Sequence, residues 1–239
     1  MLRYGDNINP AAHQIIIEYI LGKKGGIVNR HVSSFVEFGC STGALGGLIL
    51  SRYSGIEWVG IDYDQQALDI ASTRLSRTIQ MDLNKVSREE LDSIDYKPDV
   101  LVMIDVIEHL YEPQRFMGVI RQIFSEALVL CILPNIACFR TYEKLSRHEF
   151  DYEDSGIFDA THRTFYTASS AHKLFSELGY RSLIDPIYLT EPGAERLLTT
   201  TQGFPISVGT ESFQVRIETK DQLKSICSYG FGILLQPRV

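Results

Sequence analysis

The sequence has no apolar run long enough to cross a membrane. Its longest, Ala127–Leu133, is far short of the roughly 20 residues that a spanning helix needs. The N-terminus also lacks the basic-then-apolar pattern of a secretion signal. No internal repeat, low-complexity tract or Pro/Gly-rich linker divides the 239 residues. We therefore expect a cytoplasmic protein with a single domain.

Basic residues and cysteine pairs are also scarce. The 23 Lys and Arg are outnumbered by 30 Asp and Glu, which gives a net charge of −7. Broad binding to nucleic acid or to an anionic membrane needs clustered basic residues, so neither partner is expected. The cysteines form no CxxC pair, which argues against a zinc knuckle or a thioredoxin-type site.

What the sequence does contain is an alternation of short apolar stretches and helical segments. Near-continuous apolar strands separated by helices predict a parallel sheet that is covered by helices on both faces. The strands are expected at 34–38, 57–61, 78–81, 100–104 and 128–133. The helices are expected at 11–21, 43–53, 64–75, 87–93 and 113–124.

The second half is less regular. Residues 141–167 are rich in charges and aromatics with weak periodicity, and we interpret them as a lid. A helical stripe follows at 171–178, and two final strands are expected at 184–189 and 230–235. The insertion at 191–224 is expected either to cover an acceptor pocket or to form a homodimer contact.

Polar residues and glycines follow the predicted strands. In a parallel sheet, ligands bind outside the carboxyl ends of the strands. The first strand leads into Glu37-Phe-Gly39-Cys-Ser41-Thr-Gly43, and the second ends at Asp62, 23 residues after Gly39. A carboxylate at that distance can accept both ribose hydroxyls of a nucleoside cofactor. Taken singly, the glycines are also typical of a tight turn and Asp62 of a helix cap.

The glycine loop favours S-adenosylmethionine over a dinucleotide. A G-x-G-x-x-G fingerprint that starts at Gly39 needs glycines where the chain has Ser41 and Ala44. Glu37 is a poor neighbour for a pyrophosphate, but its carboxylate can stabilise the ammonium group of S-adenosylmethionine.

Four stretches carry a resemblance to the class I S-adenosylmethionine-dependent methyltransferases. They are VEFGCSTGALG (36–46), WVGIDYD (58–64), QMDL (80–83) and DVLVMIDVIEHL (99–110). The sequence departs from the family pattern at Ser41, where a glycine is usual. The resemblance implies a Rossmann-like α/β fold with a mostly parallel seven-stranded sheet, helices on both faces and a lid or insertion in the C-terminal half.

The resemblance also implies one methyltransferase domain over residues 1–239 and a role for each strand end. The domain would comprise an N-terminal helical cap (1–30), a cofactor-binding core (31–133), a lid and acceptor region (134–170) and a C-terminal part with the insertion (171–239). The implied cofactor-binding residues are Gly39, Cys40, Ser41 and Gly43 around the methionine moiety, Asp62 at the ribose, Tyr63, Asp82 and Leu83 at the adenine, and Asp105 beside the transfer site.

Two histidines are candidate catalytic residues. His109 follows the fourth strand, and His162 lies in GIFDATHRTFYT (156–167). Either imidazole can act as a general base towards an acceptor hydroxyl, and either can instead be a structural group. With LPN (133–135), that stretch resembles a bacterial subfamily that includes MetW-like proteins. We therefore predict O-methylation of a small-molecule acceptor, with Arg163 available to hold an anionic group on it.

Three alternatives stay open at this point. Asp105, Glu108, His109 and His162 resemble the metal-ligand set of small-RNA 3′-end ribose methyltransferases, which read E-V-I-E-H. Asp105 replaces the first Glu of that motif and the acidic charge suits RNA poorly, so we expect no metal and no nucleic acid. A non-catalytic MetW-like accessory protein and an NAD-dependent oxidoreductase are the other two.

Overall fold

An eight-stranded sheet runs through the described part of the chain, residues 10–22 and 31–238 of a computed structural model. The strand order is β3-β2-β1-β4-β5-β10-β6, and β7 also pairs with β10. Strands β1 to β5 are parallel, whereas β10 runs antiparallel to its neighbours. The bounds are β1 Ser34–Phe38, β2 Glu57–Asp62, β3 Arg77–Gln80, β4 Val100–Ile104, β5 Leu128–Pro134, β6 Tyr180–Ser182, β7 Ile187–Thr190 and β10 Ser228–Pro237. The mostly parallel Rossmann-like fold is confirmed, with eight strands where seven were expected, because both β6 and β7 pair with β10.

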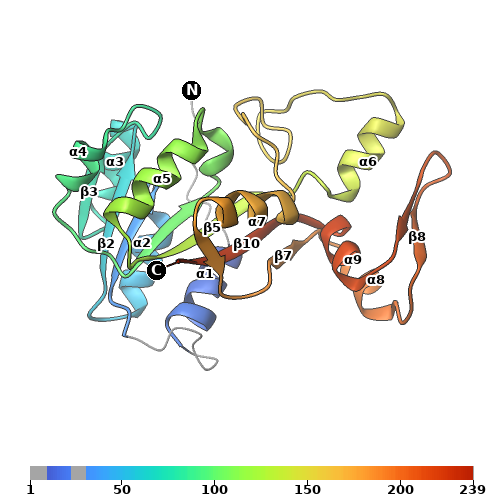
Figure 1. The fold of residues 1–239 in the computed structure, drawn as a ribbon, viewed down its shortest axis with the longest axis horizontal. Helices are drawn as coiled ribbons and strands as arrows, with labels where there is room; N and C mark the ends of the chain where they lie inside the picture. Colours follow the sequence, from blue (N-terminus) through green and yellow to red (C-terminus); the bar gives the residue numbers. More distant parts are fainter. Residues whose placement is uncertain (1–9, 23–30, 239) are drawn as a thin grey trace.

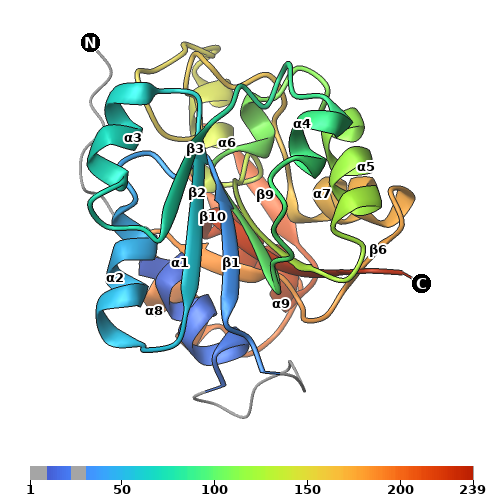
Figure 2. The same ribbon diagram turned by 90° about the vertical axis from the view of Figure 1, so that its left-hand side faces the viewer.

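Helices cover both faces of this sheet (Figures 1 and 2). One face carries α1 Pro10–Ile15, α2 Ala44–Arg52 and α3 Gln65–Ala71, and the other carries α4 Arg88–Asp92, α5 Pro113–Ile123 and α7 Ala168–Glu177. Successive residues of a strand point to opposite faces, so each strand supplies two cores. Phe35 of β1 stacks on Trp58 in the first core, and Phe38 packs edge-on against Phe116 in the second.

Gly46 is the point where α2 approaches the sheet most tightly. A Cβ atom at Gly46 would lie 2.6 Å from both Trp58 Cδ1 and Leu75 Cδ2. We expect Gly46→Ala to lower the free energy of unfolding by about 1–3 kcal/mol through overpacking. Gly118→Ala in α5 is the matched control, because a Cβ there meets nothing within 4 Å. Gly118→Ala should raise the free energy of unfolding by about 0.5–1 kcal/mol. Urea denaturation measures the free energy of unfolding of both variants. Equal effects of the two substitutions would contradict this packing.

The insertion forms a small unit with its own core. It comprises α8 Glu195–Thr200, the hairpin of β8 Ile206–Gly209 and β9 Gln214–Ile217, and α9 Lys220–Ile226. The hairpin projects away from the main sheet (Figure 1). Phe213 of this hairpin lies 5.3 Å from the Phe139 ring of α6 Phe139–Ser146, the helix that follows β5. The insertion therefore packs against the start of the predicted lid region.

The N-terminal helix is confirmed in part. The expected helix at 11–21 consists of α1 and a π-helical turn, Ile16–Ile20, whose end is marked by the Leu21 N–H donating to the Ile16 carbonyl. The expected helical cap reaches back to residue 1 and forward to residue 30, so much of it lies outside the described residues. Among those residues, no helix is both long and apolar enough to span a membrane.

Candidate active site

A cleft of about 490 Å³ opens at the carboxyl ends of β1, β2, β3 and β4. Eight of the predicted site residues line it: Gly39, Ser41, Asp62, Tyr63, Asp82, Leu83, Asp105 and His109. The other four do not line it and are buried: Glu37, Cys40, Gly43 and His162. A second hollow of about 520 Å³ shares Tyr63, Met81 and Asp82 with the cleft and continues between β3 and α4.

The loop after β1 is folded tightly against Asp62. Gly39 has a φ of 71°, and a Cβ there would lie 2.7 Å from Val106 Cγ2, so the position requires glycine. Ser41 occupies the same left-handed region with a φ of 49°. The Ser41 N–H donates to Asp62 Oδ2 at 2.8 Å, and the Asp64 N–H donates to Asp62 Oδ1 at 3.0 Å. These bonds fix the Asp62 carboxylate at the rim of the cleft, where it can accept two hydroxyls.

Glu37 is buried below the loop and is hydrogen-bonded within the core. The Trp58 indole donates from Nε1 to Glu37 Oε2 at 2.9 Å. Burial raises the pKa of Glu37 to about 8, against the opposing effect of the indole bond, and the Asp62 carboxylate adds to the increase. In the described fold, Glu37 is therefore a buried partner of Trp58 that does not line the cleft.

This burial predicts a pH dependence of stability. The folded protein keeps the Glu37 proton up to about pH 8, whereas the unfolded chain releases it near its ordinary pKa of 4.5. The contribution of Glu37 to stability is therefore largest below pH 4.5 and falls by about 4 kcal/mol as the pH rises to 8. Glu37→Gln keeps an acceptor for Trp58 without the charge. Its free energy of unfolding should exceed that of the wild type increasingly between pH 5 and 8, and parallel profiles would contradict the assignment.

Asp82 and Leu83 follow β3 and line the cleft. Lys85 Nζ lies 2.9 Å from Asp82 Oδ2, and the Asn84 N–H donates to Asp82 Oδ1. The hydrogen bond from Lys85 is the main cause that lowers the pKa of Asp82. A charged carboxylate in the lining of the cleft suits the exocyclic amine of adenine.

Glu108 lies between two histidines and is the least satisfied polar group of the site. Its side chain is 1% exposed, and neither carboxylate oxygen accepts a hydrogen bond from any described residue. One oxygen lies 3.9 Å from His162 Nε2, and ligand atoms of Glu108, His109 and His162 all lie within 4.8 Å of one another. Burial and the nearby Asp105 carboxylate raise the pKa of Glu108 well above its usual range. Buried polar groups are normally hydrogen-bonded, so a buried carboxylate with no described donor beside two imidazoles is a candidate cation site.

Backbone pairing explains why distant residues meet here. Glu108 and His109 form a short 3-10 helix after β4, while His162 belongs to the segment 147–167 that follows α6. The Glu108 carbonyl accepts the N–H groups of Arg163 and Thr164 at 2.7 and 3.2 Å. His162 is thereby held directly beside Glu108. Burial and the neighbouring His162 lower the pKa of His109, which favours its neutral form.

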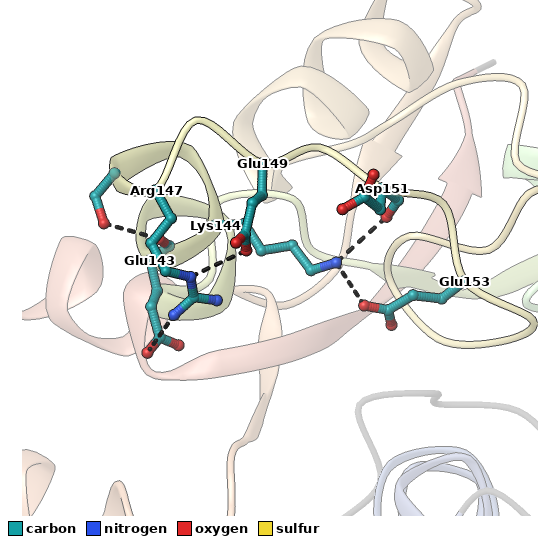
Figure 3. A network of polar contacts seen from close by, with 7 residues as sticks. Glu143, Lys144, Arg147, Glu149, Asp151 and Glu153 are labelled. Atoms are coloured by element: carbon teal, nitrogen blue, oxygen red, sulfur yellow. Dashed lines mark hydrogen bonds and ion pairs between the residues drawn. The ribbon is translucent and has the colours of Figure 1, made fainter.

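The start of the 147–167 segment is held by Lys144 of α6 (Figure 3). Lys144 Nζ lies 2.7 Å from the Glu153 carboxylate and donates to the Asp151 carbonyl at 3.3 Å. The same ammonium group lies 4.6 Å from the centre of the Phe158 ring. The segment is therefore fixed on both sides of the turn that precedes His162.

The sequence does not predict the contact between Arg163 and Tyr111, two exposed residues of the cleft. The Arg163 guanidinium lies 4.8 Å over the Tyr111 ring and donates from Nη2 to the Tyr111 hydroxyl at 3.1 Å. Both residues line the cleft, and Arg163 is the only Lys or Arg among its described lining residues.

Asn135 of the LPN stretch is fully buried and donates from Nδ2 to the Ser225 and Ser228 carbonyls, so its contacts are structural.

Comparison with known proteins agrees with this arrangement. Residues 36–126, less than half of the chain, match the family model described as a methyltransferase domain. A search of the curated proteins gives no match. These 91 matched residues contain the glycine loop, Asp62, Asp82 and the DVIEH stretch.

Solved structures share the fold at low sequence identity. The small RNA methyltransferase HEN1 is 15% identical with a TM-score of 0.60 over 100% of this chain, which corresponds to only 27% of the HEN1 chain. A SAM-dependent methyltransferase from Archaeoglobus fulgidus is 15% identical with a TM-score of 0.57, covering 96% of this chain and 94% of that one. The plantazolicin methyltransferase BpumL, solved with SAH, is 16% identical with a TM-score of 0.57, covering 95% and 82%.

The cleft lies at the strand ends of a fold that this chain shares with solved methyltransferases, and residues 36–126 match a methyltransferase domain. These findings support an S-adenosylmethionine-dependent methyltransferase with S-adenosylmethionine as its cofactor. They favour this cofactor over the alternative of a nicotinamide cofactor. Membership of the MetW-like subfamily stays a prediction.

Proposed function

We propose that this protein transfers a methyl group to a hydroxyl oxygen of a small-molecule acceptor, and that a divalent cation bound by Glu108, His109 and His162 holds that acceptor. The observation that carries the proposal is the buried Glu108 carboxylate, which lies beside two imidazoles and accepts no hydrogen bond from any described residue. This departs from the expectation of a metal-free site. In the proposal, the two histidines act as ligands rather than as general bases.

The donor set fits such a cation. Two imidazoles and a carboxylate are ligands that divalent transition metals share, and a bound cation would stabilise the charged form of Glu108 against its burial. Asp105, the fourth residue of the resembled set, does not belong to the compact group of three. It is exposed at the cleft, with a φ of 51° that turns the chain away from β4.

The cofactor would lie along the lining residues that were predicted for it. Asp62 would accept the ribose hydroxyls, Asp82 and the Leu83 backbone would face the adenine, and the loop at Gly39 and Ser41 would surround the methionine part. S-adenosylmethionine supplies a methyl group on a sulfonium that is already activated. The task of these residues is therefore alignment and the exclusion of water.

On the acceptor side, the cation, Asp105 and Arg163 would each have a separate role. The cation would polarise the acceptor hydroxyl and lower its pKa. The Asp105 carboxylate, which lines the cleft beside His109, would take the hydroxyl proton. Arg163 would hold an anionic group of the acceptor at the mouth of the cleft.

A second candidate is the 3′-terminal ribose of an RNA. It is supported by the grouping of Glu108, His109 and His162 and by the shared fold with the small RNA methyltransferase HEN1. The net charge of −7 and the single Lys or Arg among the described cleft residues favour the small-molecule acceptor.

Radiolabelled methyl transfer tests the two candidates together. The protein, with Mn²⁺ and S-adenosylmethionine, is given sugars and small molecules with adjacent hydroxyls in one series, and a short RNA with a free 3′-terminal diol in another. We expect transfer to a member of the first series that EDTA abolishes and Mn²⁺ restores. Transfer only to the RNA would favour the second candidate. Transfer that is unchanged by EDTA would refute the role of the cation.

A further inference from the structure

His109 is connected to the 147–167 segment by a chain of two hydrogen bonds. His109 Nδ1 lies 3.0 Å from Thr161 Oγ1, and Thr161 Oγ1 lies 2.6 Å from Asp159 Oδ1. The Thr161 N–H also donates to Asp159 Oδ1, at 2.7 Å. These three residues are therefore linked in the order Asp159–Thr161–His109, and the first two come from a different element than His109.

Counting protons along this chain assigns the His109 tautomer. Burial alone would raise the pKa of Asp159, but the bonds from Thr161 together with the nearby His162 and His109 lower it, so the carboxylate only accepts. The single hydroxyl proton of Thr161 is thus donated to Asp159. The Thr161 oxygen must accept at its other contact, so the proton of that bond comes from His109 Nδ1. In neutral His109, Nε2 then carries the free lone pair.

His162 shows the same arrangement with a backbone partner. Its Nδ1 lies 3.1 Å from the Ile157 carbonyl, which can only accept, so Nδ1 carries the proton there too. Its Nε2 is the atom that lies 3.9 Å from the Glu108 carboxylate. Both imidazoles therefore have one nitrogen fixed as a donor and the other left as a ligand, which is the usual support of metal-binding histidines.

We infer that Thr161 and Asp159 are positioning residues that fix the tautomer and orientation of His109 for the cation. This inference rests on the proposed function, because it concerns the same cation. It also ties the cation to the fold of the 147–167 segment. Asp159 lies in the turn whose start is held by Lys144 through Glu153, and Glu153 pairs with Asp159 in an isolated bridge.

The test compares Thr161→Val, which removes the hydroxyl, with Thr161→Ser, which keeps it. Mn²⁺ affinity is measured by isothermal titration, and S-adenosylhomocysteine affinity is measured on the same samples. We expect Thr161→Val to weaken Mn²⁺ binding about 10- to 100-fold. Thr161→Ser should restore it to within about 3-fold of the wild type, and cofactor affinity should stay unchanged in both. Equal Mn²⁺ affinity in wild type and Thr161→Val would overturn the inference.

A second readout does not depend on the metal. Long-range ¹H–¹⁵N correlation spectra of the metal-free protein report the tautomer of each histidine, and His109→Gln identifies the His109 signals. We expect the Nδ1–H form in the wild type and in Thr161→Ser, and a mixture with the Nε2–H form in Thr161→Val. An Nε2–H form in the wild type would overturn the inference. If the wild type shows the Nδ1–H form but binds no Mn²⁺, the assigned tautomer stands, whereas the proposed function and the positioning role towards a cation both fail.

Discussion

Replacement of Asp62 by asparagine is expected to weaken the binding of S-adenosylhomocysteine about 100-fold or more. Asp62 lines the cleft, and both of its oxygens are oriented by backbone N–H groups of Ser41 and Asp64. A hydrogen bond to a charged group contributes roughly 1.5–3 kcal/mol, and the ribose offers two hydroxyls to this carboxylate. Each 1.4 kcal/mol lost weakens affinity about tenfold, and isothermal titration measures it.

Asp69→Asn is the matched control for this substitution. Asp69 is exposed on α3, and its carboxylate accepts a hydrogen bond from the Gln65 side chain. Asp69→Asn should leave the affinity for S-adenosylhomocysteine within about twofold of the wild type, because Asp69 does not line the cleft. Far-UV circular dichroism separates loss of binding from loss of fold, since Asp62 also anchors the glycine loop. A folded Asp62→Asn variant that binds S-adenosylhomocysteine like the wild type would contradict the placement of the ribose.

The second large effect is expected at Glu108. Glu108→Gln keeps the size of the side chain but removes the one carboxylate among the three proposed cation ligands. Mn²⁺ affinity should fall at least about 100-fold, more than the 10- to 100-fold typical of losing a supporting residue, while cofactor affinity is unchanged. Isothermal titration with Mn²⁺ and with S-adenosylhomocysteine measures both.

The same substitution should weaken Mn²⁺ binding but raise the free energy of unfolding of the metal-free protein. An unpaired buried acceptor costs about 1–3 kcal/mol, and an amide can donate as well as accept, so metal-free Glu108→Gln should be more stable than metal-free wild type. Glu177→Gln on the surface of α7 serves as control and should change neither quantity. A metal-free Glu108→Gln protein that is less stable, with Mn²⁺ affinity intact, would mean that Glu108 has a structural role.

Local sequence signals predicted the cofactor half of the molecule well. The bounds of β1 and β4 agree with the expected strands, because the apolar stretches at 34–38 and 100–104 are both buried and sharply bounded. The glycine loop and Asp62 were placed together because parallel strands end at one edge. Glu37 was expected beside the cofactor ammonium, yet its side chain points to the Trp58 side of β1, since the sheet face that a residue occupies depends on strand register.

The arrangement of the residues around Glu108 and the 147–167 segment depends on long-range contacts, which short sequence patterns do not predict. The pairing of Glu108 with Arg163 and Thr164 joins residues that are more than 50 positions apart, and it is this pairing that places His162 beside Glu108. The Asp159–Thr161–His109 chain likewise depends on the irregular 147–167 segment, which has no periodicity to predict. The antiparallel pairing of β7 and β10 across the insertion is non-local for the same reason.

The most direct test of the account is a crystal structure of the protein with S-adenosylhomocysteine and Mn²⁺, examined by anomalous scattering at the manganese edge. The account predicts one strong anomalous peak among Glu108, His109 and His162, with the ligand's ribose at Asp62 in the same cleft. Bound S-adenosylhomocysteine at Asp62 with no manganese peak at Glu108 would contradict the proposed acceptor site.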